Sequence, residues 1–353
     1  MRATSAVRML AINKRAPEPN GARPPVRPVA PGNVSRRATT RAVVSSLKSD
    51  FLEVLQPHQV AVGAPGGLTD AVFAVRADLE QRPGLADVDA DISNAYNEVT
   101  RASICRAYAR QTNPALRAVG RFRHDLLAAE SAIYFESPTG LVRAPFASSE
   151  GVQQGDPAAS ADFAFALQPA LVAYDAFLRP HAGYALAIAD DVHARCPPHL
   201  AARGLHVLND ELRPLGLSLG LPKCGIRLLT NPAALIPIAT PHSTDPSDPS
   251  SVSYTIQGIP VSLAPGFVYG GVPIGAPTPA GWTYVQAHLA ERLDSYESDM
   301  TTIEHTLLTR HPHAMFVIGR LCLRPRVHVS TTSYATATPP TSLPSSAAST
   351  PVS

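Results

Sequence analysis

The residues best suited to chemistry are two adjacent carboxylates, Asp190 and Asp191, which directly follow the apolar run 184–189 (Tyr-Ala-Leu-Ala-Ile-Ala). This run predicts a buried strand. Two neighbouring carboxylates at its end repel each other, and burying them without a cation is costly. Mg²⁺ would remove the conflict, because it prefers oxygen ligands and keeps positions open for substrate phosphates. By itself the pair is more typical of a strand-to-turn junction, so a second signal is needed.

A third carboxylate, Asp91, ends another strand candidate, 86–92. If the two strands are neighbours in a sheet, three carboxylates converge. Such a set can hold two metal ions about 3.5–4 Å apart, which clamp the attacking and leaving oxygens of an in-line phosphoryl transfer. Asp89 lies two residues further back on the same face and is treated as secondary.

The segment 151–157 (Gly-Val-Gln-Gln-Gly-Asp-Pro) is the second signal. Glycine lets a backbone approach a ligand closely, and glutamine supplies both donors and acceptors. The alternative reading is a plain turn before a helix, with Asp156 as its cap and Pro157 in its first turn. Both readings can hold together.

These residues need a scaffold of strands and helices. Apolar periodicity and caps predict a helix-compatible stretch at 38–55 and helices at 69–81 (with Thr69 as N-cap), 97–110, 158–178, 199–213, 281–308 and 311–323. Apolar runs and turn residues predict strands at 86–92, 184–189, 192–194 and 217–229, and hairpins at 132–146 and 266–275. The central order β, α, ββ, α, β favours a sheet with helices on one face, an α+β fold.

Composition narrows the classes of protein. No apolar run reaches the about 18 residues that span a membrane, so we expect a soluble intracellular protein, nuclear or cytoplasmic, without a secretion signal. Residues 1–50 carry ten Lys and Arg against two acids. Such a basic segment could bind a polyanion or, alternatively, serve as a mitochondrial leader. Four scattered cysteines exclude a disulfide framework. His193, Cys196 and His199 have a weak zinc-like spacing, interrupted by prolines and lacking a fourth ligand.

Four segments in order resemble the palm motifs of reverse transcriptases, of the non-LTR retrotransposon type. They are 91–101 (Asp-Ile-Ser-Asn-Ala-Tyr-Asn-Glu-Val-Thr-Arg), 151–157, 188–191 (Ile-Ala-Asp-Asp) and 215–224 (Leu-Gly-Leu-Ser-Leu-Gly-Leu-Pro-Lys-Cys). Each is weak to moderate alone, but their order and separations make the resemblance specific. Flanking similarities at 11–14, 27–37, 269–275 and 321–326 extend it over roughly residues 10–328.

The resemblance implies roles for individual residues. Asp91, Asp190 and Asp191 would bind two Mg²⁺ ions, with Mn²⁺ as an alternative. Tyr96 would lie under the incoming sugar and exclude a 2′-hydroxyl. Lys223 would protonate or neutralise the pyrophosphate leaving group. The remaining contacts to nucleotide, template and triphosphate would come from Gln154, Gly155, Lys14 and Arg27.

The resemblance also implies a right-hand polymerase architecture with a ferredoxin-like antiparallel palm sheet. Residues 1–85 would be N-terminally truncated basic fingers, 86–229 the palm, 230–256 a flexible insertion, 257–328 the palm end with partial thumb-like helices, and 329–353 a disordered tail. The partners would be an RNA template, a DNA primer and a dNTP, with no membrane. The oligomeric state stays open.

The expected activity is RNA-directed DNA polymerisation, by two-metal transfer of a nucleotide from dNTP to a primer 3′-hydroxyl. Ile188, where the family usually has an aromatic residue, and Pro222, before Lys223, depart from the pattern. They motivate an alternative, a degenerate, non-catalytic nucleic-acid-binding remnant of such a polymerase. A two-carboxylate hydrolase is a third reading, and adjacent Asp190 and Asp191 suit it poorly because acid and base there need separate roles.

Overall fold

Alternating small apolar and acidic residues build the strand on which the fold is organised, β3 (Ala86–Asp91). Successive side chains of a strand point to opposite faces, so Val88 and Ala90 lie on one face and three aspartates on the other. The apolar face is buried. The computed structural model describes residues 7–13, 26–30, 32–128, 130–137, 140–230, 240–243 and 252–307.

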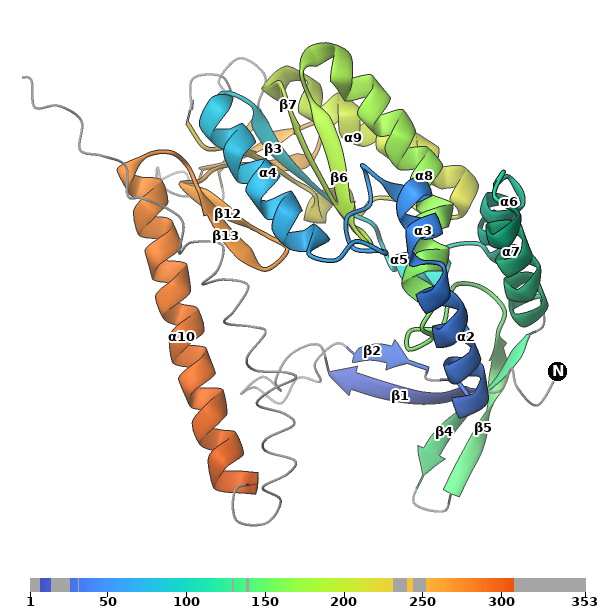
Figure 1. Cartoon of the computed structure of the whole chain (residues 1–353). Helices are drawn as coiled ribbons and strands as arrows, with labels where there is room; N and C mark the ends of the chain where they lie inside the picture. Colours follow the sequence, from blue (N-terminus) through green and yellow to red (C-terminus); the bar gives the residue numbers. More distant parts are fainter. Residues whose placement is uncertain are drawn as a thin grey trace, which may run out of the picture. The chain divides into compact units, whose positions relative to one another are not determined.

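β3 is the third of seven strands in the order β6-β7-β3-β8-β11-β10-β9. Figure 1 labels β6, β7 and β3 of this sheet. It pairs antiparallel with β7 on one side and β8 on the other. The other strands of this sheet are β6 (Tyr184–Ile188), β7 (Asp191–Cys196), β8 (Gly225–Leu228), β9 (Thr240–Ser243), β10 (Val252–Ile256) and β11 (Ile259–Leu263).

A four-stranded sheet has the order β2-β1-β4-β5. β1 runs parallel to β4, and the two outer pairs are antiparallel. Its strands are β1 (Val7–Asn13), β2 (Val26–Val29), β4 (Ser131–Ser137) and β5 (Gly140–Ser148). This sheet therefore joins segments that lie more than a hundred residues apart in the sequence.

The helices that accompany these sheets fall into two groups, which connect the strands or cover the large sheet. The connecting helices are α2 (Val34–Ser46), α3 (Lys48–Leu55), α5 (Ala95–Glu98), α6 (Arg101–Ala109) and α7 (Pro114–Leu127). The covering helices are α8 (Ala159–Leu178) and α9 (Pro198–Leu212). None of the described helices is both long and apolar enough to cross a membrane.

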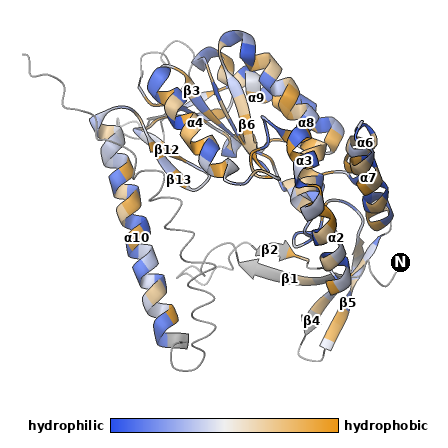
Figure 2. Ribbon diagram, in the orientation of Figure 1, coloured by the Kyte–Doolittle hydropathy of each residue, from blue (hydrophilic) through white to orange (hydrophobic). Residues whose placement is uncertain are grey.

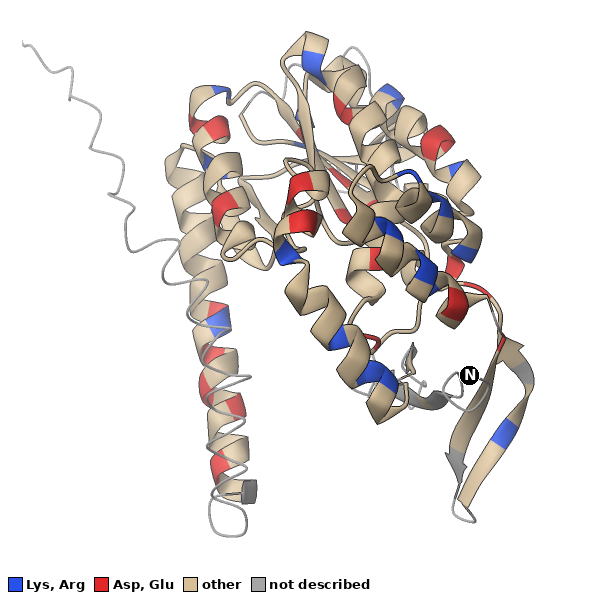
Figure 3. Ribbon diagram, turned by 45° about the vertical axis from the view of Figure 1, so that its right-hand side comes forward, with Lys and Arg blue, Asp and Glu red and all other residues tan. Residues whose placement is uncertain are grey.

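A second compact unit contains residues 68–84, 229–230 and the described part of the chain from 263 onward. Its hairpin pairs β12 (Gly266–Tyr269) with β13 (Val272–Gly275), and α10 (Pro279–Leu307) packs against β13. α4 (Gly67–Gln81) supplies most of the remaining residues. Hydrophilic and hydrophobic segments alternate along α10 (Figure 2), and acidic segments outnumber basic ones there (Figure 3).

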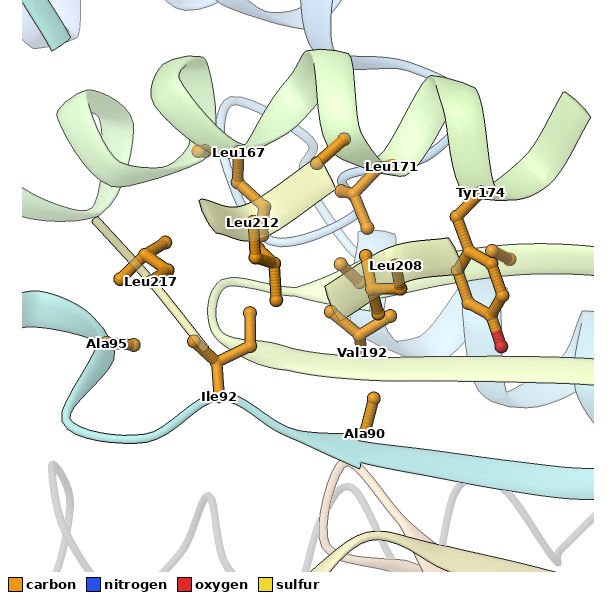
Figure 4. Close-up of a cluster of buried hydrophobic side chains, with 14 of the residues drawn as sticks. Ala90, Ile92, Ala95, Leu167, Leu171, Tyr174, Val192, Leu208, Leu212 and Leu217 are labelled. Carbon is orange, nitrogen blue, oxygen red and sulfur yellow. The ribbon is translucent and has the colours of Figure 1, made fainter. Parts of the chain in front are cut away.

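The main core lies between α8, α9 and the apolar face of the large sheet (Figure 4). Leu167, Leu171 and Tyr174 project from α8 toward Val192 of β7 and Ala90 of β3. All five side chains are at most 4% exposed. Each buried leucine contributes about 1.5–3 kcal/mol relative to exposure, so this core fixes β3 and β7 beneath the helices.

Most predicted elements form close to their expected bounds. The helix at 97–110 is divided, because the Thr100 side chain accepts a hydrogen bond from Ser103 N and caps a new helix, α6. Thr69 is not an N-cap, since α4 already begins at Gly67. The stretch 38–55 forms two helices that meet at Leu47.

The predicted strand 217–229 is wrong over most of its length. Short 3-10 turns, η2 (Arg213–Leu215) and η3 (Leu221–Lys223), precede the much shorter β8. Gly216 adopts a φ of 77° between them. The segment 230–256, expected to be a flexible insertion, contributes two strands, β9 and β10, to the large sheet. The helix predicted at 311–323 and the tail 329–353 lie outside the described residues.

Candidate active site

Asp91 and Asp191 face each other across two neighbouring strands. Asp91 is the last residue of β3, Asp191 is the first of β7, and the two are register partners in the antiparallel ladder. Directly opposed residues in such a ladder have Cα atoms about 4.5–5.5 Å apart. Asp190 precedes Asp191 in the β6–β7 turn and is half-buried. The fold therefore brings the three predicted carboxylates to one end of the sheet.

The turn that carries Asp190 is held in an unusual conformation. Ala189 adopts a φ of 58°, which L residues rarely occupy and which costs roughly 1–2 kcal/mol. The side chain of Gln59 donates to Ala189 O at 3.1 Å and accepts from Ala189 N at 3.2 Å. Gln59 is fully buried, so its amide has no solvent alternative to these two bonds.

Backbone pairing places Gln59 beside the turn. Val60 N donates to Ala187 O at 3.0 Å, and Ala187 N donates to His58 O at 2.7 Å. The chain at 58–60 thus runs parallel to β6 for one residue and anchors the strand that leads into the turn. The His58 side chain is itself held in place, because its Nε2 lies 3.2 Å from an Asp175 carboxylate oxygen.

Behind the carboxylates, the same sheet face carries basic residues opposite the other acids of β3. Asp89 is the register partner of His193, and its Oδ1 lies 3.1 Å from His193 Nδ1. Asp87 is the partner of Arg195, whose Nε lies 3.0 Å from Asp87 Oδ1. Arg227 of β8 forms an ion pair with Asp89. These pairs tie β7, β3 and β8 together under the site.

Burial acts differently on the two inner acids. Burial raises the pKa of Asp87 to about 6, although His193 and Arg195 oppose the rise. Burial alone would also raise the pKa of Asp89, but hydrogen bonding to His193 and the charge of Arg227 lower it below its usual value. Asp89 therefore stays ionised more readily than Asp87.

Tyr96 lies close to the acidic end of the sheet. Its ring stacks on Phe163 with centroids 5.0 Å apart, and its hydroxyl is 3.3 Å from Ser160 Oγ. Burial raises the pKa of Tyr96, and the negative charges of Asp190 and Asp191 raise it further against the opposing hydrogen bond. The half-buried ring is positioned by α8 as well as by its own helix, α5.

The segment 151–157 is bound to the residues that follow β3. Gly151 N donates to Val99 O at 3.1 Å, and Val152 N donates to Tyr96 O at 2.8 Å. Gly151 has a φ of 68°, and a Cβ there would lie 2.4 Å from Asn97 O. Only glycine permits this approach, so the glycine at this position has a structural role.

The end of the same segment is fixed by buried ion pairs. Asp156 Oδ2 accepts from Arg36 Nη2 at 2.9 Å and from Arg123 Nη1 at 3.2 Å. Burial alone would raise the pKa of the Asp156 carboxyl, but Arg123, the Ala158 N–H and Arg36 lower it. The Ala158 N–H donates to Asp156 Oδ1 at 3.0 Å, but α8 begins at Ala159 with Ala158 as its N-cap, so Asp156 is not the cap and Pro157 precedes the first turn.

Gln154 and Gly155 occupy the accessible part of the segment. Gln154 is half-buried and Gly155 exposed, with a φ of 110°. Ala30 N donates to Gln154 O at 2.9 Å, which joins the segment to the strand that contains Arg27. The backbone of Arg27 lies in β2, where it pairs with Ile12 of β1. Lys14 lies outside the described residues.

Lys223 also reaches the acidic end. Its Nζ lies 3.9 Å from Asp91 Oδ2, and both side chains are exposed. Gly220 N donates to Asp91 O at 2.9 Å, so the segment before Lys223 packs against the end of β3. An exposed pair at this separation contributes little to stability, which leaves the ammonium available to another anion.

The oxygen ligands at the acidic end fit a hard divalent cation by their chemistry. Among the described residues, however, no group of three or more His, Cys, Asp or Glu side chains is arranged to hold a metal ion. Asp91, Asp190 and Asp191 share an end of the sheet, and their side chains would have to turn toward a common centre to share an ion.

The zinc-like spacing does not form a site among these residues. His193 and Cys196 are three residues apart on β7, so their side chains point to opposite faces of the sheet. His193 contacts the two inner acids of β3. Burial raises the pKa of the Cys196 thiol to about 12, which disfavours the thiolate that binds zinc.

Sequence reasoning missed the structural roles of Gln59 and Arg36. Gln59 stands in a segment with no periodic signal, and only its contact with Ala189 reveals its role. Arg36 resembles a residue of a solvated helix face, yet it is 5% exposed and binds Asp156. The basic residues at the start of α2 could have suggested a buried acid partner, but the sequence does not say which acid.

Comparison with known proteins gives no match by sequence, either to a family model or to a curated protein. Solved structures do match. Apo telomerase from Candida tropicalis aligns with 77% of this chain and 47% of its own, at 11% identity and a TM-score of 0.50. The chain has the fold of a reverse-transcriptase-related polymerase.

Two further telomerase structures also match. Telomerase from Candida albicans, in complex with a TWJ fragment of telomeric RNA, aligns with 94% of the chain and 55% of its own at 11% identity, with a TM-score of 0.49. A C-terminally truncated apo telomerase from Candida tropicalis has a TM-score of 0.45 at 13% identity, over 64% of this chain and 50% of its own. The chain spans about half the length of these telomerases.

Proposed function

We propose that this chain is an RNA-directed DNA polymerase domain of the non-LTR retroelement type, which transfers nucleotides from dNTPs to a primer 3′-hydroxyl on an RNA template. One observation carries the proposal. Asp91 and Asp191 are register partners at one end of the sheet, with Asp190 beside them, in a polymerase fold related to reverse transcriptases. Two-metal phosphoryl transfer uses oxygen ligands gathered in this way.

In this proposal Asp91, Asp190 and Asp191 hold Mg²⁺ or Mn²⁺. When bound, the ions would neutralise charge on the triphosphate and on the attacking oxygen. Tyr96 presents the edge of its stacked ring to the sugar and excludes a 2′-hydroxyl. Lys223, 3.9 Å from Asp91 and exposed, supplies a proton or positive charge to the pyrophosphate.

The remaining proposed contacts involve the basic N-terminal part of the chain and the 151–157 segment. Gln154 and Gly155 would contact nucleotide and template, because they form its accessible part. Lys14 and Arg27 would bind the triphosphate, Arg27 in a bidentate manner. The backbone bond between Ala30 and Gln154 supports this grouping, since it brings the strand of Arg27 to the segment.

Primer extension tests the proposal. A labelled DNA primer on an RNA template is incubated with dNTPs and Mg²⁺, and wild type is compared with Asp190→Ala. Asp210→Ala is the matched control, because Asp210 is an exposed aspartate on α9 whose Oδ1 lies 3.4 Å from Arg213 Nη1. We expect extension by wild type and the control, and none by Asp190→Ala. No extension by wild type, or equal extension by Asp190→Ala, contradicts polymerase activity.

A non-catalytic remnant that binds nucleic acid is the second candidate. Ile188 and Pro222 depart from the family pattern, and no three ligands among the described residues are arranged around a common centre. This candidate predicts RNA or heteroduplex binding that weakens with salt, because phosphate contacts release counterions, without any extension. A folded protein with no affinity at low salt would exclude it.

A further inference from the structure

A cavity of about 680 Å³ opens between α6 and α7, and none of its lining residues belongs to the candidate active site. Small residues from both helices line it: Cys105, Ala109 and Gly120. The helices pack tightly there, since a Cβ on Gly120 would lie 2.5 Å from the Cβ of Tyr108. The volume is in the range of about 300–1,000 Å³ that is usual for small-ligand sites.

Arginines surround this cavity. Arg106 comes from α6, and Arg117 and Arg121 come from α7. Basic segments recur along both helices in Figure 3, and Asp125 is the one acid that lines the cavity. Asp125 lies 3.6 Å from its neighbour His124, and three arginines outnumber it. The lining is therefore strongly positive.

Arg117 and Arg121 are the most informative pair. Both are exposed and they are four residues apart on α7, so they lie on one side of the helix. In the part of the chain that the structure describes, neither guanidinium has a hydrogen-bond or ion-pair partner. Like charges at this spacing destabilise a helix. An anion bound between them would remove that repulsion.

We infer that this cavity binds a nucleotide of single-stranded RNA. Guanidinium groups bind phosphate in a bidentate manner, and Arg117 and Arg121 are placed to share one phosphate or to bind two successive ones. An unstacked base can lie on an arginine plane, and the interior lined by Cys105, Ala109 and Gly120 leaves room for it. The choice of RNA among anions rests on the proposed function, but binding here needs no catalysis.

Fluorescence anisotropy with a labelled, unstructured single-stranded RNA tests the site in the full chain. Arg117→Gln with Arg121→Gln should weaken binding about tenfold and reduce the slope of log K against log salt by about two, one for each lost phosphate contact. Arg110→Gln is the matched control, since Arg110 is exposed at the end of α6 and does not line the cavity. It should change affinity less than about twofold.

Ala109→Trp tests the cavity itself, because it fills the space without changing charge. We expect about a tenfold loss of affinity with an unchanged salt slope. Circular dichroism and thermal melting confirm that the variants fold. The site is refuted if Arg110→Gln weakens binding as much as the double variant, if Ala109→Trp has no effect, or if polyglutamate competes as well as RNA.

Discussion

Gln59 and Ala189 are 130 residues apart in the sequence, yet the Gln59 side chain satisfies both backbone polar groups of Ala189. Ala189 is the left-handed residue of the turn that carries Asp190. A strained backbone persists only where its surroundings determine it. Gln59 therefore holds the carboxylate turn in place through the backbone of Ala189.

Gln59→Ala should reduce primer extension by about 10²-fold, mainly in kcat, because the turn loses its two anchoring bonds and the carboxylates lose their placement. Stability should fall by about 1–3 kcal/mol, since the Ala189 groups are left without their partner. Steady-state extension kinetics and urea denaturation measure the two effects.

Gln168→Ala is the control for this prediction. Gln168 is a 9% exposed glutamine that donates to Val54 O and Leu55 O, both at 3.2 Å, and does not touch the turn. The Gln168→Ala variant should lose about as much stability as Gln59→Ala and keep the kcat of wild type. If both variants lose kcat equally, Gln59 supports the fold in general and not the turn.

Tyr96→Val should admit ribonucleotides, because it removes the ring that stacks on Phe163 near Asp190 and Asp191. We expect the ratio of kcat/KM for dNTP to that for rNTP to fall by about 10²-fold. Tyr96→Phe keeps the stack and loses only the bond to Ser160, so its ratio should stay near that of wild type. Equal ratios in all three proteins would remove Tyr96 from sugar selection.

Arg36→Gln should destabilise the fold by about 3–5 kcal/mol, because Asp156 then keeps a buried charge with one arginine fewer. Arg37→Gln is the neighbouring control, and Arg37 is exposed. It should stay within about 0.5 kcal/mol of wild type. Thermal and urea unfolding distinguish the two. A neutral Arg36→Gln would mean that Arg123 alone compensates Asp156.

Asp87 gives the sheet a pH dependence. Its pKa is raised from 3.8 to about 6 on folding, so the folded state holds a proton that the unfolded state has lost within this window. The stabilisation is therefore complete below about pH 4 and is lost as pH rises through about 6. The difference between the two values corresponds to about 3 kcal/mol.

The test replaces Asp87→Asn and Arg195→Met together, so that neither buried charge is left alone. Free energies of unfolding are measured from about pH 4 to pH 7 for this double variant and wild type. Wild type should lose stability relative to the variant as pH rises to about 6, and the difference should then level off. If the free energies of unfolding of the two proteins changed in parallel with pH, Asp87 would not hold the extra proton.

Local patterns predicted much of the fold and the carboxylate end of the site. The apolar run before Asp190 and the alternation in 86–91 each indicate a strand from neighbouring residues alone, and both strands form. The strand at 217–229 failed, because Gly216 and Pro222 break the extended chain where the pattern showed only apolar alternation.

Contacts between distant segments could not be predicted. The pairing of Asp156 with Arg36 and Arg123, and that of Gln59 with Ala189, depend on tertiary packing and leave no periodic mark in the sequence. The register of β3 with β7, which sets Asp91 opposite Asp191, is likewise a property of the assembled sheet. The carboxylates were predicted from the sequence, whereas the contacts that hold them depend on tertiary packing.

The acidic face of β3 has one further consequence. Its two inner aspartates meet basic residues across the ladder, Asp87 with Arg195 and Asp89 with His193, whereas Asp91 meets another acid, Asp191. A basic residue at 191 would complete the series and stabilise the sheet. The chain has an aspartate there instead, so this end of the sheet holds two opposed carboxylates. Like charges that face each other across a ladder destabilise the pair, so a cation bound between them would stabilise this end of the sheet.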